Sequence, residues 1–313
     1  MPDRERTPSG ADQFDDDAVV VCAGLTKDYG QGRGVFALDL AIRRGEVFGF
    51  VGPNGAGKTT IIRLLMDLVR PDRGIATILG RDSRRDNLWI KRDVGFLPGE
   101  LPQFPGVSAG YVIGLLAGLR GGVTPARIEA LAERLDLDLG ARYERLSHGS
   151  KQKVHLIQAF MHDPALLILD EPTLGLDPLM QREFRALVAE AVAGGATVLL
   201  SSHILAEVER ICSRIGLISE GHLLRVGTME QLRTVRAHRV EAIVRDRRDV
   251  ADLARIPGVA DAEVDGERVT CTVRGSAGPL LAWLSAGDVV ELDSRELSLE
   301  EVFLSEFAPG PAQ

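Results

Sequence analysis

The segment that most constrains the fold is Gly52–Thr59, which reads Gly-Pro-Asn-Gly-Ala-Gly-Lys-Thr. It satisfies the pattern G-x-x-x-x-G-K-[ST], with an apolar strand pattern over Val47–Val51 before it and a helical pattern over Ile61–Val69 after it. In such a loop, glycines let backbone N–H groups and the helix N-terminus surround a phosphate, and the lysine adds a mobile positive charge. An ordinary glycine-rich turn is the alternative, but the strand–loop–helix setting favours phosphate binding. The residues expected to contact a nucleotide here are Gly52, Pro53, Asn54, Gly55, Ala56, Gly57, Lys58, Thr59 and Thr60.

A second apolar run, Leu166–Leu169, ends in the two carboxylates Asp170 and Glu171. A buried parallel strand would deliver these acids to the same edge of a sheet as the phosphate loop. We expect Asp170, together with the Thr59 hydroxyl, to bind Mg²⁺ and Glu171 to act as the general base toward water. Alone, such a pair would usually be a solvated turn, but the phosphate loop upstream reverses that interpretation.

From Val19 to about Arg236, short runs rich in Val, Ile and Leu alternate with segments of helical period, which predicts an α/β fold. Strand signals disappear between residues 100 and 160, where we expect a helical insertion. The predicted strands are Val19–Leu25, Val35–Ile42, Glu46–Val51, Val94–Leu97, Leu166–Leu169, Thr197–Ser201, Arg214–Ser219 and His222–Val226.

After Arg236 the pattern of elements restarts. The order β-α-β-β-α-β, with a hairpin turn at Asp265-Gly266, is that of a ferredoxin-like unit, a small α+β fold. A last helix is expected over Leu299–Phe307. No site-like group of Cys, His or carboxylates occurs in the sequence after Arg236, so we expect a regulatory or accessory role for this domain. The expected organisation is a disordered tail at 1–17, a catalytic domain at 18–236 with its helical part at about 100–160, and an accessory domain at 237–313.

Composition excludes several classes of protein. The formal net charge is −8, which disfavours a nucleic-acid binder. The longest run without charge or strong polarity, Ala109–Leu119, is much shorter than the roughly 20 apolar residues that cross a bilayer. Cys22, Cys212 and Cys271 are odd in number and widely spaced, which fits neither a disulfide framework nor a zinc site. A reducing cytosol is therefore expected.

A third motif, Leu146–Lys153, opens another helical segment with Ser147-His148-Gly149-Ser150. It lies between the phosphate loop and Asp170-Glu171, which are followed by Leu174–Asp177 and His203. In this order and spacing the chain resembles the nucleotide-binding subunit of an ATP-binding cassette (ABC) transporter. The resemblance runs from about Val19 to Arg236 and implies a P-loop NTPase core of ABC type with a helical subdomain.

The resemblance assigns roles to the remaining motif residues. Ser147, Gly149 and Ser150 would bind the γ-phosphate of ATP held by an opposing subunit, although His148 and Ser150 replace the usual Gly and Gln. Asp177 would communicate across that dimer. His203 would contact the γ-phosphate, and Tyr29 would stack on adenine. For Tyr29, a half-exposed loop residue without this role is the alternative.

One family position is absent. Near Leu97 the family has a Gln that binds Mg²⁺ and couples to the membrane partner, whereas this chain has Gly99. Glu100 or Gln103 could substitute, or either could be a solvated loop residue. A backbone carbonyl at Gly99 or a water molecule could also complete the metal shell.

The resemblance implies a function that uses ATP and Mg²⁺. The chain would hydrolyse ATP at the cytoplasmic face of the membrane and power a separate permease, paired with a second nucleotide-binding subunit that we expect to be its own copy. Leu97–Glu100 and Leu297–Phe303 resemble bacterial ABC-2-type exporters of drugs, antibiotics or lipids. The alternatives are an importer subunit and a soluble ABC ATPase such as a DNA-repair head, but the latter needs a long coiled coil that about 90 residues between the motifs do not hold.

Overall fold

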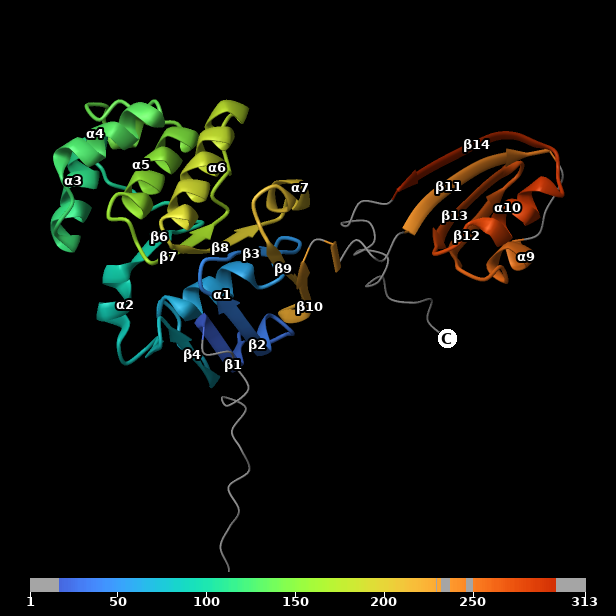
Figure 1. The fold of residues 1–313 in the computed structure, drawn as a ribbon, viewed down its shortest axis with the longest axis horizontal. Helices are drawn as coiled ribbons and strands as arrows, with labels where there is room; N and C mark the ends of the chain where they lie inside the picture. The colour runs from blue at the N-terminus through green and yellow to red at the C-terminus, as the bar shows by residue number, and fades with distance from the viewer. Residues whose placement is uncertain (1–16, 229, 232–236, 246–249, 297–313) are drawn as a thin grey trace, which may run out of the picture. The chain divides into compact units, whose positions relative to one another are not determined.

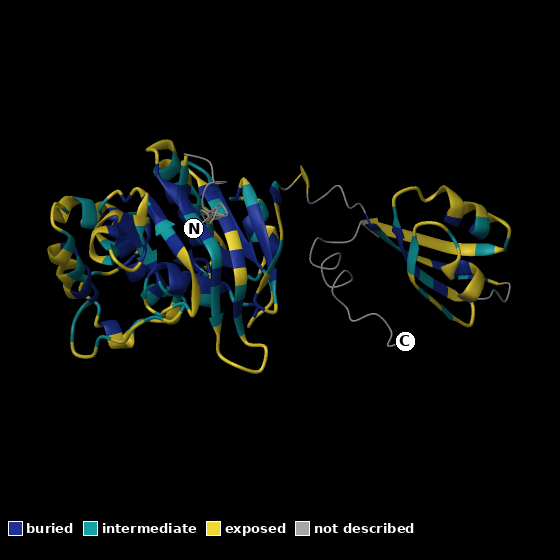
Figure 2. Ribbon diagram, turned by 90° about the horizontal axis from the view of Figure 1, so that it is seen from below, coloured by how far each residue is buried: buried dark blue, intermediate teal, exposed yellow. Residues whose placement is uncertain are grey.

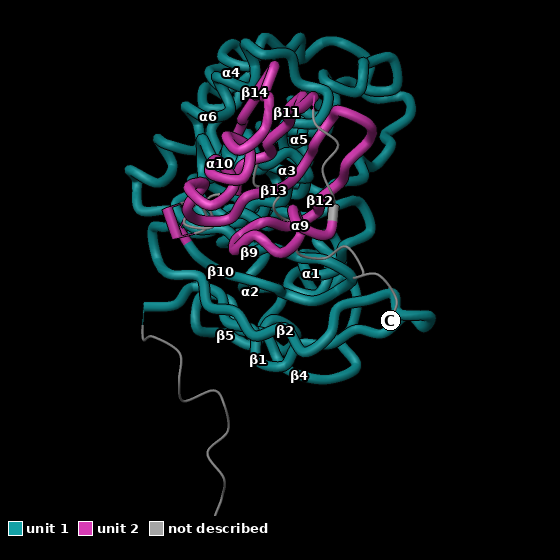
Figure 3. The backbone as a smooth tube through the Cα atoms, turned by 90° about the vertical axis from the view of Figure 1, so that its right-hand side faces the viewer, with its two compact units in different colours: residues 1–227 teal, residues 228–313 magenta. Residues whose placement is uncertain are grey.

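The computed structural model describes residues 17–228, 230–231, 237–245 and 250–296. The chain divides into two compact units, Met1–Gly227 and Thr228–Gln313, which Figure 3 colours separately. The proposed domain limit at 236/237 remains a prediction, because residues 232–236 lie outside the described part. The expected helix over Leu299–Phe307, and all but the last residue of the expected tail, also lie outside it.

The central sheet of unit 1 has the strand order β10-β9-β3-β8-β7-β6 (Figure 1). The pairs β9–β3, β3–β8, β8–β7 and β7–β6 are all parallel. Every residue of β3, β7 and β8 is buried, as expected for parallel strands covered on both faces. The strands are β3 (Val47–Val51), β6 (Val94–Leu97), β7 (Leu166–Asp170), β8 (Thr197–Ser202), β9 (Arg214–Ser219) and β10 (His222–Thr228).

A second, antiparallel sheet has the order β2-β1-β4-β5. Its strands are β1 (Ala18–Asp28), β2 (Gly34–Arg43), β4 (Arg73–Ile78) and β5 (Arg81–Asp82). The sequence analysis did not predict β4 and β5. Strand β4 begins with three exposed residues and buries only Ala76 and Ile78 against β1, so its apolar signal is weak.

Helix α1 (Lys58–Leu65) packs against both sheets, with contacts to β7 and to β2 and β4. Ile61, Ile62, Leu64 and Leu65 bury its apolar face in the core shared with those strands. The phosphate loop that precedes α1 is therefore fixed between two sheets. Figure 2 colours the ribbon by burial and shows many buried residues in the strands of this unit.

A mainly helical segment separates β6 from β7. It contains α3 (Ala109–Arg120), α4 (Pro125–Arg134), a short 3₁₀ turn (Tyr143–Arg145) and α5 (His148–Phe160). Ser108 caps α3, and Thr124 with Pro125 at the first helical position begins α4. Apart from a single bridge between Ser108 and Arg142, residues 98–165 contain no β-pairing. The remaining helices of unit 1 are α2 (Asn87–Asp93), α6 (Pro178–Ala193) and α7 (Leu205–Glu209).

Unit 2 has its own four-stranded antiparallel sheet, in the order β12-β13-β11-β14. Val240, Val244, Cys271 and Leu284 belong to its separate hydrophobic core. Along the chain its elements are β11 (Ala237–Val244), α9 (Val250–Ala254), β12 (Val259–Asp265), β13 (Arg268–Arg274), α10 (Gly278–Ser285) and β14 (Val289–Glu296).

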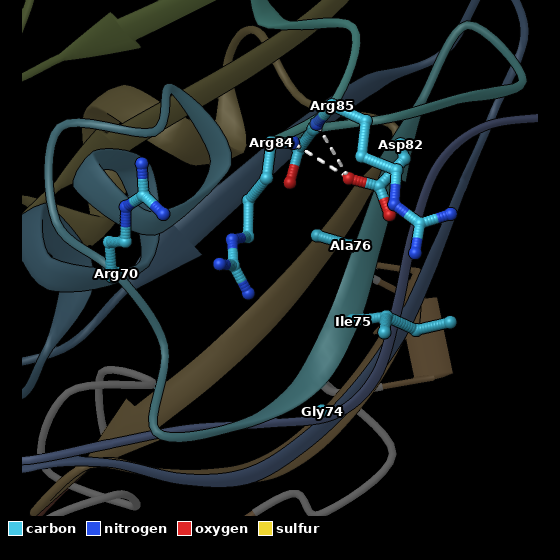
Figure 4. Close-up of a pocket in the computed structure, with 8 residues that line it drawn as sticks. Arg70, Gly74, Ile75, Ala76, Asp82, Arg84 and Arg85 are labelled. Carbon is cyan, nitrogen blue, oxygen red and sulfur yellow. Dashed lines mark hydrogen bonds between the residues drawn. The ribbon is translucent and has the colours of Figure 1, made fainter.

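Beside β4, unit 1 has a hollow of about 320 Å³ whose lining includes Arg70, Arg84 and Arg85 (Figure 4). The backbone N–H groups of Arg84 and Arg85 both donate to Asp82 Oδ1 at 2.9 Å, so a carboxylate of the chain already fills the anion position there. None of the predicted nucleotide-binding residues lines this hollow.

The structure also bears on membrane spanning and on disulfides. Within the ranges that it describes, no helix combines the length and the apolar character needed to cross a membrane. Cys22, Cys212 and Cys271 are all free and buried.

Candidate functional site

The carboxyl ends of β3, β8 and β7 meet at one edge of the parallel sheet. Val51 pairs with Ser202, and Asp170 pairs with Ser201. The phosphate loop, the acidic pair and His203 follow these three neighbouring strands. The sheet therefore assembles residues that are far apart in sequence, at the edge where open α/β sheets bind ligands.

Glycines shape the phosphate loop for steric reasons. A Cβ on Gly52 would overlap the carbonyl oxygen of Ile218, and Gly57, the N-cap of α1, has φ 110°. A Cβ on Gly57 would also lie 3.1 Å from the carbonyl oxygen of Gly34. Side chains at either position would displace the loop, so the backbone remains free to face a phosphate at the N-terminus of α1.

Lys58 lies inside this loop. Its Nζ donates to the carbonyl oxygens of Gly52, at 2.5 Å, and Pro53, at 3.1 Å. It also lies 3.7 Å from Glu171 Oε1. Burial lowers the pKa of Lys58, and the nearby charges of Glu171 and Asp170 partly oppose that shift. The ammonium group is thus held between the phosphate loop and the acidic pair.

The two acids occupy different environments. Asp170 is 1% exposed, and its Oδ1 accepts a hydrogen bond of 2.5 Å from Ser201 Oγ. Glu171 points toward Lys58 and His203, with its Oε2 2.9 Å from His203 Nδ1. One acid is therefore fixed by a neutral donor, whereas the other lies between two basic side chains. That difference suits a metal ligand and a proton acceptor, respectively.

The third motif packs against Leu174–Asp177. Ser147 caps α5 by accepting from Ser150 N at 3.1 Å, and Asp177 caps α6 by accepting from Met180 N at 2.9 Å. A Cβ on Gly149 would overlap the carbonyl oxygen of Gly175. Within one chain, Ser147, Gly149, Ser150 and Asp177 therefore also stabilise local structure. The N-terminus of a helix such as α5 is the kind of site where backbone N–H groups bind an anion.

Sequence reasoning missed two buried polar residues at this site. Gln152, on α5, donates from Nε2 to the carbonyl oxygens of Glu171 and Pro172, both at 3.1 Å. Ser201, on β8, contacts both acids. The available signals were a polar residue on the buried face of a helix and a hydroxyl at the end of an apolar strand. Neither signal identifies the residue that the polar side chain contacts in the folded protein.

The structure places Gly99, Glu100 and Gln103 differently from one another. A Cβ on Gly99 would lie 2.7 Å from Asp170 Oδ2, so the backbone there lies close to the carboxylate. Glu100 turns toward Arg63, 3.3 Å away, with its side chain 88% exposed. Gln103 Oε1 accepts from Lys151 Nζ at 3.1 Å. Neither Glu100 nor Gln103 is brought to Asp170 in this arrangement.

Tyr29 follows β1 in the turn that leads to β2. The residue is 47% exposed, and Lys27 Nζ lies 5.6 Å from the centroid of its ring. The same turn reaches Gly34, whose carbonyl oxygen lies next to Gly57 of the phosphate loop. An exposed ring in this turn is compatible with stacking on a purine.

The chemistry of these donors fits ATP with a magnesium ion. In the described residues, no group of three or more His, Cys, Asp or Glu side chains could hold a metal ion by itself. Mg²⁺ typically takes only one or two protein ligands in addition to substrate phosphates and water. The Thr59 hydroxyl, on the first turn of α1, and the Asp170 carboxylate are of the right chemical type for that limited role.

Comparison with known proteins identifies the family. Residues 35–174 match the family model described as ABC transporter. The chain is 34% identical to the Nod factor export ATP-binding protein I of Cupriavidus pinatubonensis, in a match covering 92% of this chain and 90% of that protein. This chain belongs to the ABC transporter family. The expected family is thereby confirmed, and with it the assignment as an ATP-hydrolysing subunit.

Two further similarities extend the assignment. The chain is 32% identical to the daunorubicin resistance ATP-binding protein DrrA3 of Streptomyces coeruleorubidus, over 92% of this chain and 95% of that protein. A solved ATP-binding subunit of an ABC transporter aligns with a TM-score of 0.64 and 30% identity, covering 69% of this chain and 92% of that one. The P-loop NTPase fold of ABC type is thus confirmed for unit 1.

Proposed function

We propose that this ABC ATPase powers a separate membrane permease that exports drugs, antibiotics or lipids. The match to the Nod factor export and daunorubicin resistance proteins supports this, because it covers 92% of the chain in both cases and so extends into unit 2. An importer subunit would carry the same catalytic motifs, but the names of these relatives favour export.

The observation that carries the catalytic part is the position of Glu171, 2.9 Å from His203 Nδ1 and directly after Asp170. In our proposal, Glu171 accepts a proton from the attacking water and His203 orients that carboxylate. The phosphate loop and Lys58 bind the β- and γ-phosphates. Thr59 and Asp170 hold Mg²⁺, which when bound neutralises phosphate charge. Tyr29 stacks on adenine.

A second copy of the chain would complete each site. The N-terminus of α5, with Ser147, Gly149 and Ser150, offers backbone N–H groups to an anion, and the resemblance assigns that anion to ATP on the opposing copy. Asp177 lies in the segment that packs against Gly149 and would transmit closure between the two sites. We therefore expect a homodimer that closes on two ATP molecules.

The permease would contact exposed apolar residues of α2 and α3. Leu88, Trp89, Tyr111 and Leu119 are large apolar residues that are 57–78% exposed. Arg120 joins the two helices by donating from Nη1 to the carbonyl oxygens of Lys91 and Val94 at the C-terminal end of α2. Contact there would hold the ATPase peripherally at the cytoplasmic face of the membrane.

For unit 2 we propose a ferredoxin-like accessory domain. The order β-α-β-β-α-β together with the sheet order β12-β13-β11-β14 supports that fold. A separate core and the absence of a metal-binding side-chain group among its described residues support a regulatory rather than a catalytic role.

The test is to co-express the tagged chain with candidate permeases from the same genome and to purify the membrane complex. We expect a permease to co-purify, and inside-out vesicles carrying the complex to accumulate a drug or lipid only with ATP and Mg²⁺. The variants Leu119→Asp and Leu88→Asp should lose the permease but keep ATP binding. Substrate movement in the opposite direction would establish the importer alternative.

A further inference from the structure

Ser201 on β8 contacts both acids of the site through one hydroxyl group. Its Oγ donates to Asp170 Oδ1 at 2.5 Å, and the backbone N–H of Glu171 donates to Ser201 Oγ at 3.1 Å. We propose that Ser201 is a positioning residue that fixes the metal-binding carboxylate and the general base relative to each other. This inference rests on the catalytic roles proposed above for Asp170 and Glu171.

The hydroxyl has one proton, and the geometry determines where that proton lies. The N–H of Glu171 is a donor, so Ser201 Oγ must act as its acceptor and can use its proton only toward Asp170. Asp170 Oδ1 is then occupied, which leaves Oδ2 as the oxygen available to a metal ion. Ser201 and Asp170 are 0% and 1% exposed, so bulk water has no access to replace this bond.

The backbone conformation of Glu171 is an independent reason to assign a positioning role to Ser201. The Glu171 φ of 49° lies in the left-handed region, which is unfavourable for a non-glycine residue and persists only where neighbours hold it. The Glu171 N–H is shared by the Oγ and the carbonyl oxygen of Ser201, the latter at 3.2 Å. Gln152 holds the Glu171 carbonyl from the other side. This conformation directs the side chain toward His203 and Lys58.

Gly99 approaches the other oxygen of the Asp170 carboxylate. Residue 99 has no side chain, and a Cβ there would lie 2.7 Å from Asp170 Oδ2. No side chain at position 99 can therefore orient the carboxylate. Ser201 orients it through Oδ1, and the absence of a side chain at residue 99 avoids a clash with Oδ2.

The decisive variant is Ser201→Ala, which removes the hydroxyl and adds no new group. Losing a hydrogen bond that orients a metal-binding side chain typically costs about 10- to 100-fold in metal affinity or activity. We expect a fall in kcat of that size and a severalfold increase in the Mg²⁺ concentration for half-maximal rate. The Kd for ATP measured in EDTA should stay unchanged, because the phosphate loop is intact.

Thr197→Val is the matched control. Thr197 lies at the other end of β8, is also 0% exposed, and accepts one hydrogen bond from Gly45 N at 3.0 Å. The variant removes a buried hydroxyl from the same strand at a distance from both acids. It should lower the melting temperature about as much as Ser201→Ala, while kcat and the Mg²⁺ requirement remain those of the wild type.

A second readout does not depend on hydrolysis. The ratio of ATP Kd values without and with Mg²⁺ reports metal coupling directly, and Ser201→Ala should bring that ratio closer to one. If the wild type binds MgATP but does not hydrolyse it, the proposed role of Glu171 as general base is wrong. The ratio of Kd values still tests the positioning role of Ser201 in that case. If Ser201→Ala does not fold, Ser201→Cys keeps a weak donor of similar size and should give an intermediate ratio. A folded variant with wild-type kcat, Mg²⁺ requirement and Kd ratio would overturn the proposal.

Discussion

At the scale of single residues, the two adjacent acids of the site lie in different environments. Asp170 is buried and receives a hydroxyl proton, whereas Glu171 lies beside Lys58 and His203. The difference follows from Asp170 ending a buried strand and from Glu171 turning into the left-handed conformation directly after it.

Replacing Glu171 with Gln should abolish steady-state hydrolysis and preserve ATP binding, because the amide keeps the shape but cannot accept the proton. We expect kcat to fall at least 100-fold, as is typical when a general base is lost, and the closed dimer to accumulate with ATP. ATPase assays and size-exclusion chromatography check this. Lys58→Ala is the contrasting variant, since it should raise the Kd for ATP. Near-normal turnover in Glu171→Gln would refute the assigned role.

Replacing Glu100 with Ala should leave the Mg²⁺ requirement of hydrolysis unchanged. The side chain of Glu100 is 88% exposed and pairs with Arg63, so it would have to leave that contact to reach a metal ion. An exposed pair of this kind contributes at most about 1 kcal/mol to stability. Mg²⁺ titrations of the ATPase rate for Glu100→Ala and Gln103→Ala decide the point. A severalfold shift for Glu100→Ala alone would restore Glu100 to the metal shell.

At the scale of elements, the loop after β6 is attached to the helical segment by polar and aromatic contacts. The Tyr143 hydroxyl donates to the carbonyl oxygen of Pro102 at 2.8 Å and lies 2.9 Å from His155 Nε2 on α5. Phe104 packs edge-on against Tyr143, and Gln103 bonds to Lys151. The loop that contains Gly99 is therefore joined to α5, the helix that Ser147 caps.

This contact should weaken in acid. Burial lowers the pKa of His155 to about 4 from 6.5, so the unfolded chain binds a proton more readily than the folded one. Stability from the neutral imidazole is complete above pH 6.5 and is lost as the pH falls toward 4, by about 3 kcal/mol at most. Thermal melting of wild type and His155→Gln at pH 7.5 and 5 tests this, with a smaller decrease expected for the variant. Equal decreases would assign the acid sensitivity elsewhere, for example to His162.

The elements differ in how far the sequence predicts them. The parallel strands and the phosphate loop have strong local patterns, because strands buried on both faces are continuously apolar. Strand β4 lacks that pattern, since half of it is exposed and it is defined by pairing with β1. Ser201 acquires its role only from the register that places it opposite Asp170. The register between strands that are distant in sequence is a property of the folded sheet, and a local sequence pattern does not predict it.

At the scale of the whole molecule, the nucleotide site and unit 2 are built from separate sets of residues. The candidate site residues lie between Tyr29 and His203, all within unit 1. Unit 2 has a core of its own around Val240 and Cys271. Each unit therefore contains the apolar burial that an independent domain requires.

A chain ending at residue 236 should fold and bind ATP with the Kd of the full-length protein. The measurements are ATP titration and circular dichroism of both forms, with Lys58→Ala in the shortened chain as the control for specific binding. We expect the missing unit to change the basal ATPase rate or dimer formation. A soluble, folded truncation that fails to bind ATP would show that the nucleotide site needs unit 2.

Gly149 lies so close to the carbonyl oxygen of Gly175 that a Cβ would overlap it, and we expect movement of one segment to displace the other. In a closed dimer, the first segment of each copy would touch the ATP of its partner, and the second would lie beside that copy's own Asp170-Glu171. Filling one site would then alter the geometry of the other before a second ATP arrives. The rate of the paired enzyme should consequently rise sigmoidally with ATP concentration, and a mixed dimer with one Glu171→Gln copy should retain less than half of the wild-type rate.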